Sequence, residues 1–516
     1  MSSATDRPSA RPHAGRHTDT RREAPLRMDA GEFRSAGHAL VDSIATFLES
    51  VPERPVTHGE SPEEIRHALD AAAHLPESGS DAAALLHDAA RLLYEHSLFN
   101  GHPRFFGYIT SSPAPIGMLA DLLAAAVNPN VGAWRLSPMA TEIEAQTIRW
   151  IAELVGYPTP CGGLLVSGGN MANIVGLFAA RAAAAEWDVR SRGVAARDTR
   201  PLRIYASKET HTWLQKGADL AGLGTDSVRW IATDDDLRMR VDELRAAIEH
   251  DRAAGDLPMM VIGTAGSVST GAVDPLTEIA ELCRREKIWF HVDGAYGAFA
   301  AAVPDTPPEL RALALADSVA MDPHKWLYAP LEVGCVLVRD AERLRKAFSY
   351  HPPYYHFGQE ATNFVDLGPQ NSRGFRALKV WLALRQVGRE GYVRMIEDDI
   401  HLTRQLHGAV SEHPELEPFT LALSISTFRY VPRDLRALLG EERVERYLDS
   451  LNQELLERIQ LSGEAFVSNA VISDRYVLRA CIVNFNTTPA DVEALPEIVA
   501  RIGRATDAEL RPAAVL

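Results

Sequence analysis

The sequence predicts an α/β fold with a mainly parallel central sheet, and two patterns in the middle of the chain support this prediction. Between residues 202 and 321, short apolar runs alternate with amphipathic segments, as in strands connected by helical crossovers. Glycine-rich or polar groups follow several of these runs directly, at positions where parallel sheets bind their ligands. With 516 residues, the chain is also long enough for one large domain and one or two smaller ones.

Composition and charge narrow the classes of function. The chain is 46% hydrophobic and 24% charged, as expected of a soluble globular protein, and it has no run of 18 apolar residues. Its net charge of −16 argues against binding to nucleic acid or to an anionic membrane. The four cysteines form no CxxC pair, so neither a metal site nor a disulfide framework is expected. The N-terminus lacks the apolar segment of a signal peptide, which favours a cytoplasmic location.

The N-terminal part is expected to be a disordered arm followed by helices. Residues 1–27 contain six arginines among polar residues and almost nothing apolar, so we expect a disordered basic arm. Two amphipathic helices follow at 29–50 and 85–98, each with one apolar stripe. Both stripes need a covering surface, which in a large enzyme is often a partner subunit, so residues 28–110 are expected to form a helical dimerisation segment.

The remaining elements predict a large α/β domain at 111–395 and a small α+β domain at 396–516. The large domain is expected to contain strands at 202–206, 227–232, 259–265, 288–292 and 318–321, with helices at 116–127, 140–155, 174–186, 213–220, 242–250, 276–286 and 375–386. A helix at 392–410 leads out of this domain. The small domain is expected to combine helices at 441–461 and 491–504 with apolar runs at 428–431 and 479–485.

The segment Ser167-Gly168-Gly169-Asn170 follows an apolar run and precedes an alanine-rich helix. A strand, a glycine turn and a helix together point backbone N–H groups at an anion, and the helix dipole adds about half a positive charge. Gly168 and Gly169 would let a phosphate approach the backbone closely. The segment has neither a GK[ST] ending nor a full GxGxxG pattern, so a plain strand-to-helix turn is the alternative.

Three further groups lie at or near predicted strand ends. Asp293 ends a strand and is followed by the small Ala295, Lys325 follows the strand at 318–321, and His211 opens a helix. Pyridoxal 5′-phosphate (PLP), a flat, phosphorylated, cationic aldehyde, matches these groups. Lys325 would bind its aldehyde, Asp293 would hold the proton on its ring nitrogen, His211 would cover one ring face, and Ala295 would leave room at the other. Individually, Lys325 also fits a surface lysine beside a turn, Asp293 a strand-end cap, His211 a helix start and Asn170 a turn.

The order of these motifs resembles that of the group II PLP-dependent amino-acid decarboxylases, the family of aromatic-L-amino-acid, histidine and glutamate decarboxylases. The resemblance runs from about residue 29 to about residue 395. It rests on the segments Phe33–Asp42, His102–Tyr108, Trp134–Pro138, Ser167–Asn173, Thr210–His211, Ala265–Ser267, His291–Tyr296, Asp322–Trp326 and Arg373–Lys379. It implies fold type I of the PLP-dependent enzymes, PLP as the cofactor, and an obligate homodimer with the active site at the interface.

The resemblance also implies residue roles. In this family, a loop after the lysine carries a tyrosine that protonates the carbon left when CO₂ departs, and relatives with phenylalanine there make aldehydes. Tyr354 best matches this tyrosine, with Tyr355 and Tyr350 as alternatives. His324 is implied to pack beside the lysine, near the phosphate and the substrate. Val268 is a departure, because the family often has threonine there, so the hydroxyl contact expected from that position is absent.

The expected reaction is the decarboxylation of a neutral, hydrophobic L-amino acid to its primary amine and CO₂. Phe105, Phe106 and Trp134 make the expected substrate pocket largely apolar, and no basic cluster there would hold a second carboxylate, which disfavours glutamate. Aromatic side chains and branched aliphatic ones, such as those of valine and leucine, both remain compatible. The alternatives are a decarboxylating aldehyde synthase on the same fold and a catalytically silent scaffold.

Overall fold

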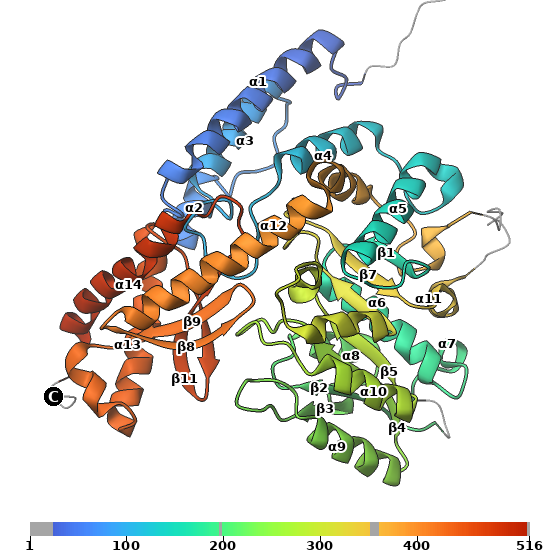
Figure 1. Ribbon diagram of the computed structural model, residues 1–516. Coiled ribbons are helices and arrows are strands. Elements are labelled where there is room, and N and C mark those ends of the chain that lie inside the picture. The colour runs from blue at the N-terminus through green and yellow to red at the C-terminus, as the bar shows by residue number, and fades with distance from the viewer. Residues whose placement is uncertain (1–23, 196–198, 351–360, 513–516) are drawn as a thin grey trace, which may run out of the picture.

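The central feature of the computed structural model, which describes residues 24–195, 199–350 and 361–512, is a seven-stranded sheet (Figure 1). Its strand order is β1 (Gly162–Val166), β7 (Gly334–Val338), β6 (Ser318–Met321), β5 (Trp289–Asp293), β4 (Leu257–Thr264), β2 (Leu202–Ser207) and β3 (Val228–Ile231). The strands from β6 to β3 pair in parallel, which confirms the predicted α/β class with a mainly parallel sheet. Most of the predicted arm at 1–27 lies outside the described residues.

Strand β7 is an element that the sequence reading missed. It pairs antiparallel with both β1 and β6, and all five of its residues are buried. Val166 at the end of β1 pairs with Gly334, and Met321 at the end of β6 pairs with the next residue, Cys335. The glycine segment after β1 and the lysine segment after β6 therefore leave the sheet at the same edge.

Helices cover both faces of this sheet and extend beyond it (Figure 1). The helices of the central part are α4 (Pro115–Val127), α5 (Pro138–Leu154), α6 (Gly169–Ala184), α7 (Val189–Arg192), α8 (Trp213–Leu220), α9 (Val241–Ala253), α10 (Leu276–Glu286) and α11 (Ala341–Phe348). The helices predicted at 213–220 and 276–286 are confirmed residue for residue. Among the described residues, no helix is both long and apolar enough to cross a bilayer.

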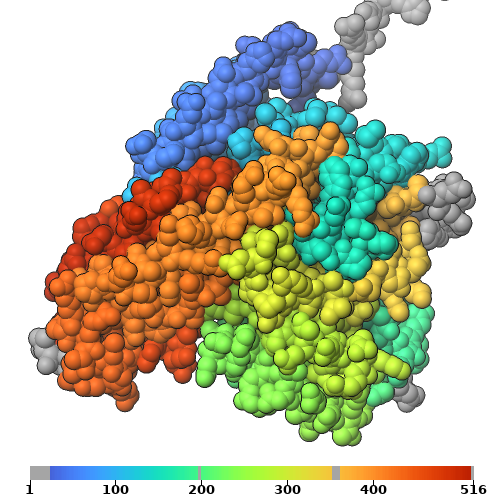
Figure 2. Space-filling model, in the orientation of Figure 1, coloured from blue at the N-terminus to red at the C-terminus, as the bar shows by residue number. Residues whose placement is uncertain are grey.

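The predicted N-terminal helices are confirmed as α1 (Ala30–Ser50) and α3 (Ala82–Glu95), with the short α2 (Pro62–Ala68) between them. Helix α1 begins with a capping box, in which Asp29 accepts from the backbone of Glu32 and the Glu32 side chain accepts from that of Asp29. No residue of α1 or α3 is buried. The space-filling view shows these helices standing out at one side of the molecule (Figure 2).

The two helices predicted at 375–386 and 392–410 are confirmed, and they are joined across a kink at Gly388 into the element α12 (Ala377–Glu412). Gly388 has φ +67° and ψ 172°, a non-helical conformation that only glycine adopts readily, and it separates the two helices of this element. The element runs from α4 and α5 to the second sheet (Figure 1). The predicted domain boundary at 395/396 falls inside it and remains a prediction.

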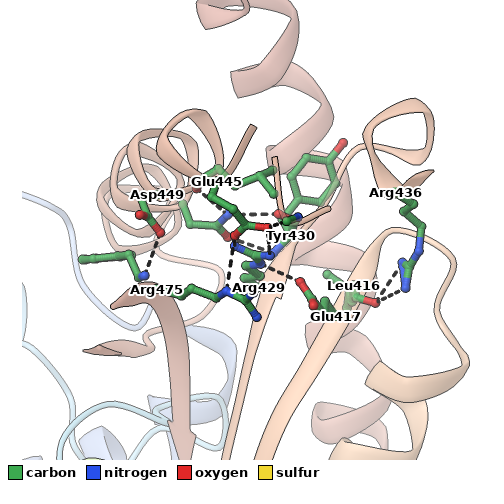
Figure 3. A network of polar contacts seen from close by, with 12 residues as sticks. Leu416, Glu417, Arg429, Tyr430, Arg436, Glu445, Asp449 and Arg475 are labelled. Atoms are coloured by element: carbon green, nitrogen blue, oxygen red, sulfur yellow. Dashed lines mark hydrogen bonds and ion pairs between the residues drawn. The ribbon is translucent and has the colours of Figure 1, made fainter. Parts of the chain in front are cut away.

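The C-terminal part is a four-stranded antiparallel sheet backed by helices. Its strand order is β10 (Ser468–Ile472), β11 (Arg475–Cys481), β9 (Ile425–Tyr430) and β8 (Leu416–Ala422), and its helices are α13 (Glu442–Ser462) and α14 (Pro489–Leu510). A buried cation joins these elements (Figure 3). The guanidinium of Arg429 on β9 donates to Glu417 on β8 at 2.6 Å and to Glu445 on α13 at 2.7 Å. Arg429 is completely buried, and the negative charges of Glu417 and Glu445 compensate for the water that its guanidinium loses.

Candidate active site

Asp293, the last residue of β5, is buried and held by two hydrogen bonds. Its Oδ2 accepts the indole N–H of Trp213 at 2.7 Å, and its Oδ1 accepts the backbone N–H of Ala295 at 3.2 Å. Trp213 is the first residue of α8, so β5 and α8 together set the orientation of the carboxylate. The sequence reading predicted Asp293 and Ala295 but missed Trp213.

His211 lies just before α8 and within the electrostatic reach of Asp293 and Lys325. Its Nδ1 accepts the backbone N–H of Trp213 at 3.1 Å, which leaves Nε2 to carry the proton of the neutral ring. Partial burial lowers the pKa of His211, the charge of Lys325 adds to this effect, and the carboxylates of Asp293 and Asp322 oppose it. The imidazole therefore favours the neutral form, which suits stacking on a flat ring.

Lys325 follows β6 in a tight turn, and its ammonium contacts a buried carboxylate. The Nζ atom lies 3.1 Å from Oδ2 of Asp322, and Nε2 of His324 lies 3.6 Å from the same oxygen. The other oxygen of Asp322, Oδ1, is buried and has no hydrogen-bond partner. Burial lowers the pKa of His324, with the charge of Lys325 acting in the same direction and that of Asp322 opposing it.

The glycine segment packs directly against these groups. A Cβ atom on Gly169 would lie 2.7 Å from Oδ2 of Asp322 and 2.9 Å from Cβ of Ala295, so only glycine fits there. Helix α6 begins at Gly169, not near residue 174 as predicted, which places Gly169 and Asn170 in its first turn. The unpaired backbone N–H groups of that turn are available to an anion.

A buried hydrogen-bond chain connects α6 with the sheet beneath the site. Nε2 of His291 contacts Oδ1 of Asn173 at 2.7 Å, and its Nδ1 contacts Oγ of Ser318 at 2.7 Å. Ser318 Oγ accepts the indole N–H of Trp289 at 2.9 Å, so its own hydrogen is directed at Nδ1. Burial lowers the pKa of His291 to about 4, which keeps the ring neutral as this chain requires.

Two predicted pocket residues are packed inside the chain. Phe105 stacks on Phe466 at a centroid distance of 5.4 Å, and Phe106 belongs to the core of the C-terminal part. Trp134 is 37% exposed, and its indole N–H donates to Glu142 at 2.8 Å. Of the three predicted pocket residues, Trp134 therefore has an accessible ring within a single chain, whereas Phe105 and Phe106 are buried.

Of the three candidate tyrosines, Tyr354 and Tyr355 lie outside the described residues. Tyr350 is 68% exposed, and the guanidinium of Arg190 lies 3.8 Å from its ring centroid. The Nε atom of Arg190 also donates to the Tyr350 hydroxyl at 3.2 Å. Tyr350 is therefore held at the surface by α7.

A family model for the pyridoxal-dependent decarboxylase conserved domain matches residues 62–429. This chain belongs to that family. Family members decarboxylate amino acids with PLP, so the chain is a PLP-dependent amino-acid decarboxylase of fold type I.

The relatives agree with this assignment over most of the chain. The chain is 33% identical to an aromatic-L-amino-acid decarboxylase from Bacillus atrophaeus, over 90% of this chain and 94% of the relative. It is 30% identical to a phenylacetaldehyde synthase from Arabidopsis thaliana, over 88% of this chain and 92% of the relative. The crystal structure of Oryza sativa TDC with PLP and tryptamine superposes with a TM-score of 0.86 at 28% identity, covering 94% of this chain and 99% of that one.

The residues of this decarboxylase that meet at the sheet edge fit PLP. Gly168 has φ +142°, and only glycine fits at position 169 between Asp322 and Ala295, so the first turn of α6 lies with its unpaired N–H groups directly beside these residues. A primary amine, Lys325, and a buried, oriented carboxylate, Asp293, supply the two other groups that a phosphorylated pyridine aldehyde needs. The glycine segment, Asp293 and Lys325 thus come together from the ends of β1, β5 and β6, with His211 in the loop before α8, as the sequence predicted.

Arg479 is a further buried cation that the sequence reading missed. Its Nε donates to the carbonyl of Val268 at 2.7 Å and one Nη to the carbonyl of Tyr108 at 2.9 Å, while its other Nη is buried without a partner. Burial raises the pKa of Cys481, and the charges of Arg479 and Lys325 both oppose that rise, so both cations lie near this thiol. An arginine within the otherwise apolar run of residues 476–481 in β11 was the available signal in the sequence.

Proposed function

We propose that this decarboxylase converts an aromatic L-amino acid to its primary amine and CO₂. The observation that supports this most is the meeting of Lys325, Asp293, His211 and the glycine segment at one sheet edge, in a chain whose relatives are named for aromatic substrates. The branched aliphatic alternative finds no support among these relatives, and we do not carry it further.

The proposed roles follow from the chemistry of each group. When bound, PLP supplies a protonated ring that accepts the electrons of the bond to the departing CO₂. Lys325 would bind it covalently and release the product, and Asp293 would hold the proton on the ring nitrogen. His211 would cover one face and Ala295 would border the other. Gly169, Asn170 and the first turn of α6 would take the phosphate, with His324 beside it.

Two further groups would act on the substrate. Tyr354 would give a proton to the carbon that loses CO₂, as its match to the family loop implies. Arg479 would hold the substrate carboxylate through its unpartnered Nη, because a buried guanidinium with a free N–H is a strong site for a carboxylate. The backbone carbonyl of Val268 already orients Arg479. In this arrangement, the hydroxyl of a threonine at position 268 would not be needed to place the substrate carboxylate.

The same scaffold supports a second candidate, a decarboxylating aldehyde synthase. The relative named phenylacetaldehyde synthase is 30% identical over 88% of this chain, nearly as similar as the decarboxylase from Bacillus atrophaeus. Tyr354 favours the simple decarboxylase, since aldehyde-forming relatives are expected to have phenylalanine at that position.

We also propose that the active unit is a homodimer. Exposed apolar side chains gather on the N-terminal helices, including Phe33 and Leu93, each 63% exposed, and they continue on α4 with Val127 at 68%. A second copy that covers these faces would remove them from water. It would also bring Trp134, exposed on its own chain, against a neighbouring subunit.

The deciding experiment incubates the purified PLP-loaded protein with L-phenylalanine, L-tyrosine, L-tryptophan, L-valine and L-glutamate. CO₂, amine, aldehyde and hydrogen peroxide are measured together. We expect equal amounts of amine and CO₂ from at least one aromatic substrate, without peroxide. Aldehyde with peroxide would instead establish the aldehyde synthase, and no turnover of any substrate would support the silent scaffold.

A further inference from the structure

Asp399 is a buried carboxylate that has no part in the roles proposed above. It lies on α12 beyond the kink at Gly388 and is 2% exposed. Its Oδ2 accepts hydrogen bonds from the indole Nε1 of Trp326 at 3.0 Å and from the hydroxyl of Tyr328 at 2.7 Å. Both donors come within three residues after Lys325, so a single oxygen holds the segment that carries the lysine.

The backbone after Lys325 needs such an anchor. The backbone N–H of Tyr328 donates to the carbonyl of Lys325 at 3.0 Å, and this turn places Tyr328 at φ +50°. That left-handed conformation is unfavourable for a residue with a Cβ and persists only where the surroundings enforce it. Asp399 accepts a hydrogen bond from the hydroxyl of Tyr328. Phe485 packs edge-on against the Tyr328 ring, with 5.4 Å between the two ring centroids.

The other oxygen of Asp399 faces the C-terminal part of the chain. Its Oδ1 lies 3.4 Å from the backbone nitrogen of Asn484, which donates to it. The side-chain amide of Asn484 donates to the carbonyl of His102 at 2.8 Å. Asp399 therefore connects the lysine segment with Asn484 and, through it, with the start of the aromatic segment that ends at Tyr108.

We propose that Asp399 is a positioning residue that sets the orientation of Lys325 through Trp326 and Tyr328, an inference that rests on the proposed function. A space-filling role would be met equally well by an apolar side chain. That side chain, however, would leave the indole N–H and the hydroxyl buried without an acceptor. Retaining a carboxylate here is itself costly: burial raises the pKa of Asp399 to about 7, although the bonds from Tyr328 and Trp326 oppose the rise.

The test measures how fast Lys325 captures PLP, independently of turnover. Full-length apoprotein is mixed with PLP and quenched with borohydride at set times, and the labelled Lys325 peptide is quantified by mass spectrometry. The variants are Asp399→Leu, Asp399→Asn and Tyr328→Phe, with Asp398→Asn, an exposed acid on the same helix, as the matched control. Circular dichroism and thermal melting of the same samples report the folded fraction.

We expect capture at least about tenfold slower in Asp399→Leu and Tyr328→Phe, since small errors of placement strongly slow the reactions of positioned groups. Asp399→Asn retains an acceptor oxygen and should recover most of the wild-type rate, and the control should equal wild type. A wild-type rate in folded Asp399→Leu would overturn the inference and leave the proposed function intact. If Asp399→Leu does not fold, unchanged capture in Tyr328→Phe has the same meaning. Failure of wild type to label Lys325 would overturn both.

Discussion

Asp293 combines burial with a fixed orientation, which distinguishes it from a simple strand-end cap. Its two oxygens accept from different elements, one from the indole of Trp213 and one from the backbone of Ala295. A carboxylate held in this way needs no reorganisation when a charged partner arrives. It is therefore suited to keep a proton on a pyridine nitrogen.

Replacing this carboxylate by an amide tests that role. We expect Asp293→Asn to lower kcat by about 100-fold or more, because the amide does not stabilise a protonated ring nitrogen. Trp213→Phe, which keeps the charge but removes one orienting bond, should cost distinctly less. Steady-state kinetics at saturating PLP measure both, and a wild-type kcat in Asp293→Asn would contradict the assignment.

His291 should make the protein sensitive to acid. Because its pKa is lowered from 6.5 to about 4, the unfolded chain binds a proton between these values that the folded chain does not. The free energy of unfolding should thus fall as the pH drops from 6.5 to 4, by up to about 1.4 kcal/mol per pH unit from this residue. In urea titrations, His291→Gln should show a shallower dependence over this range than wild type or the exposed control His250→Gln. Parallel curves for all three proteins would rule out this explanation.

The sequence allowed prediction of the site residues that belong to local motifs, such as Lys325 and Asp293. Trp213, Asp399 and Arg479 were not identified. The contacts that give them significance join residues far apart in the chain, 80 positions for Trp213 with Asp293 and 211 for Arg479 with Val268. A local pattern carries no signal for such pairs.

Among the elements, helices and strands with clear periodicity were predicted closely, whereas connections between them were not. Strand β7 was not predicted. It lies antiparallel between β1 and β6, which breaks the alternation of strands and helices on which the prediction depends. The two helices predicted on either side of Gly388 are both present, and the non-helical backbone of this glycine joins them within α12.

The backbone conformation of Gly388 can be tested by substitution. With φ +67° and ψ 172°, this position should tolerate no Cβ without strain, although nothing would collide with one. We expect Gly388→Ala to reduce the free energy of unfolding by about 1–3 kcal/mol in denaturant titrations. Gly408→Ala, in the regular part of the same helix with equally open space, should be neutral or stabilising. Equal stability of the two variants would contradict the strained-kink assignment.

For the whole molecule, the exposed N-terminal helices predict a dimer that activity requires. We expect the double variant Phe33→Glu, Leu93→Glu to sediment as a monomer in analytical ultracentrifugation, because each charge would be buried unpaired in the interface. Its activity should fall with the dimer fraction. Val471→Glu, at a position that is 60% exposed on β10, is the matched control and should remain dimeric. A dimeric double variant would show that these helices lie outside the interface.

We propose that Lys325, at the edge where β1, β5 and β6 end, carries out PLP-dependent decarboxylation of an aromatic L-amino acid. The most direct measurement is the release of labelled CO₂ from L-phenylalanine, L-tyrosine and L-tryptophan carrying ¹⁴C in the carboxyl group, by wild type and Lys325→Ala at saturating PLP. We predict release by wild type from at least one of the three and a loss of at least about 1,000-fold in Lys325→Ala. Release at the wild-type rate without Lys325, or none from PLP-loaded wild type, would contradict the claim.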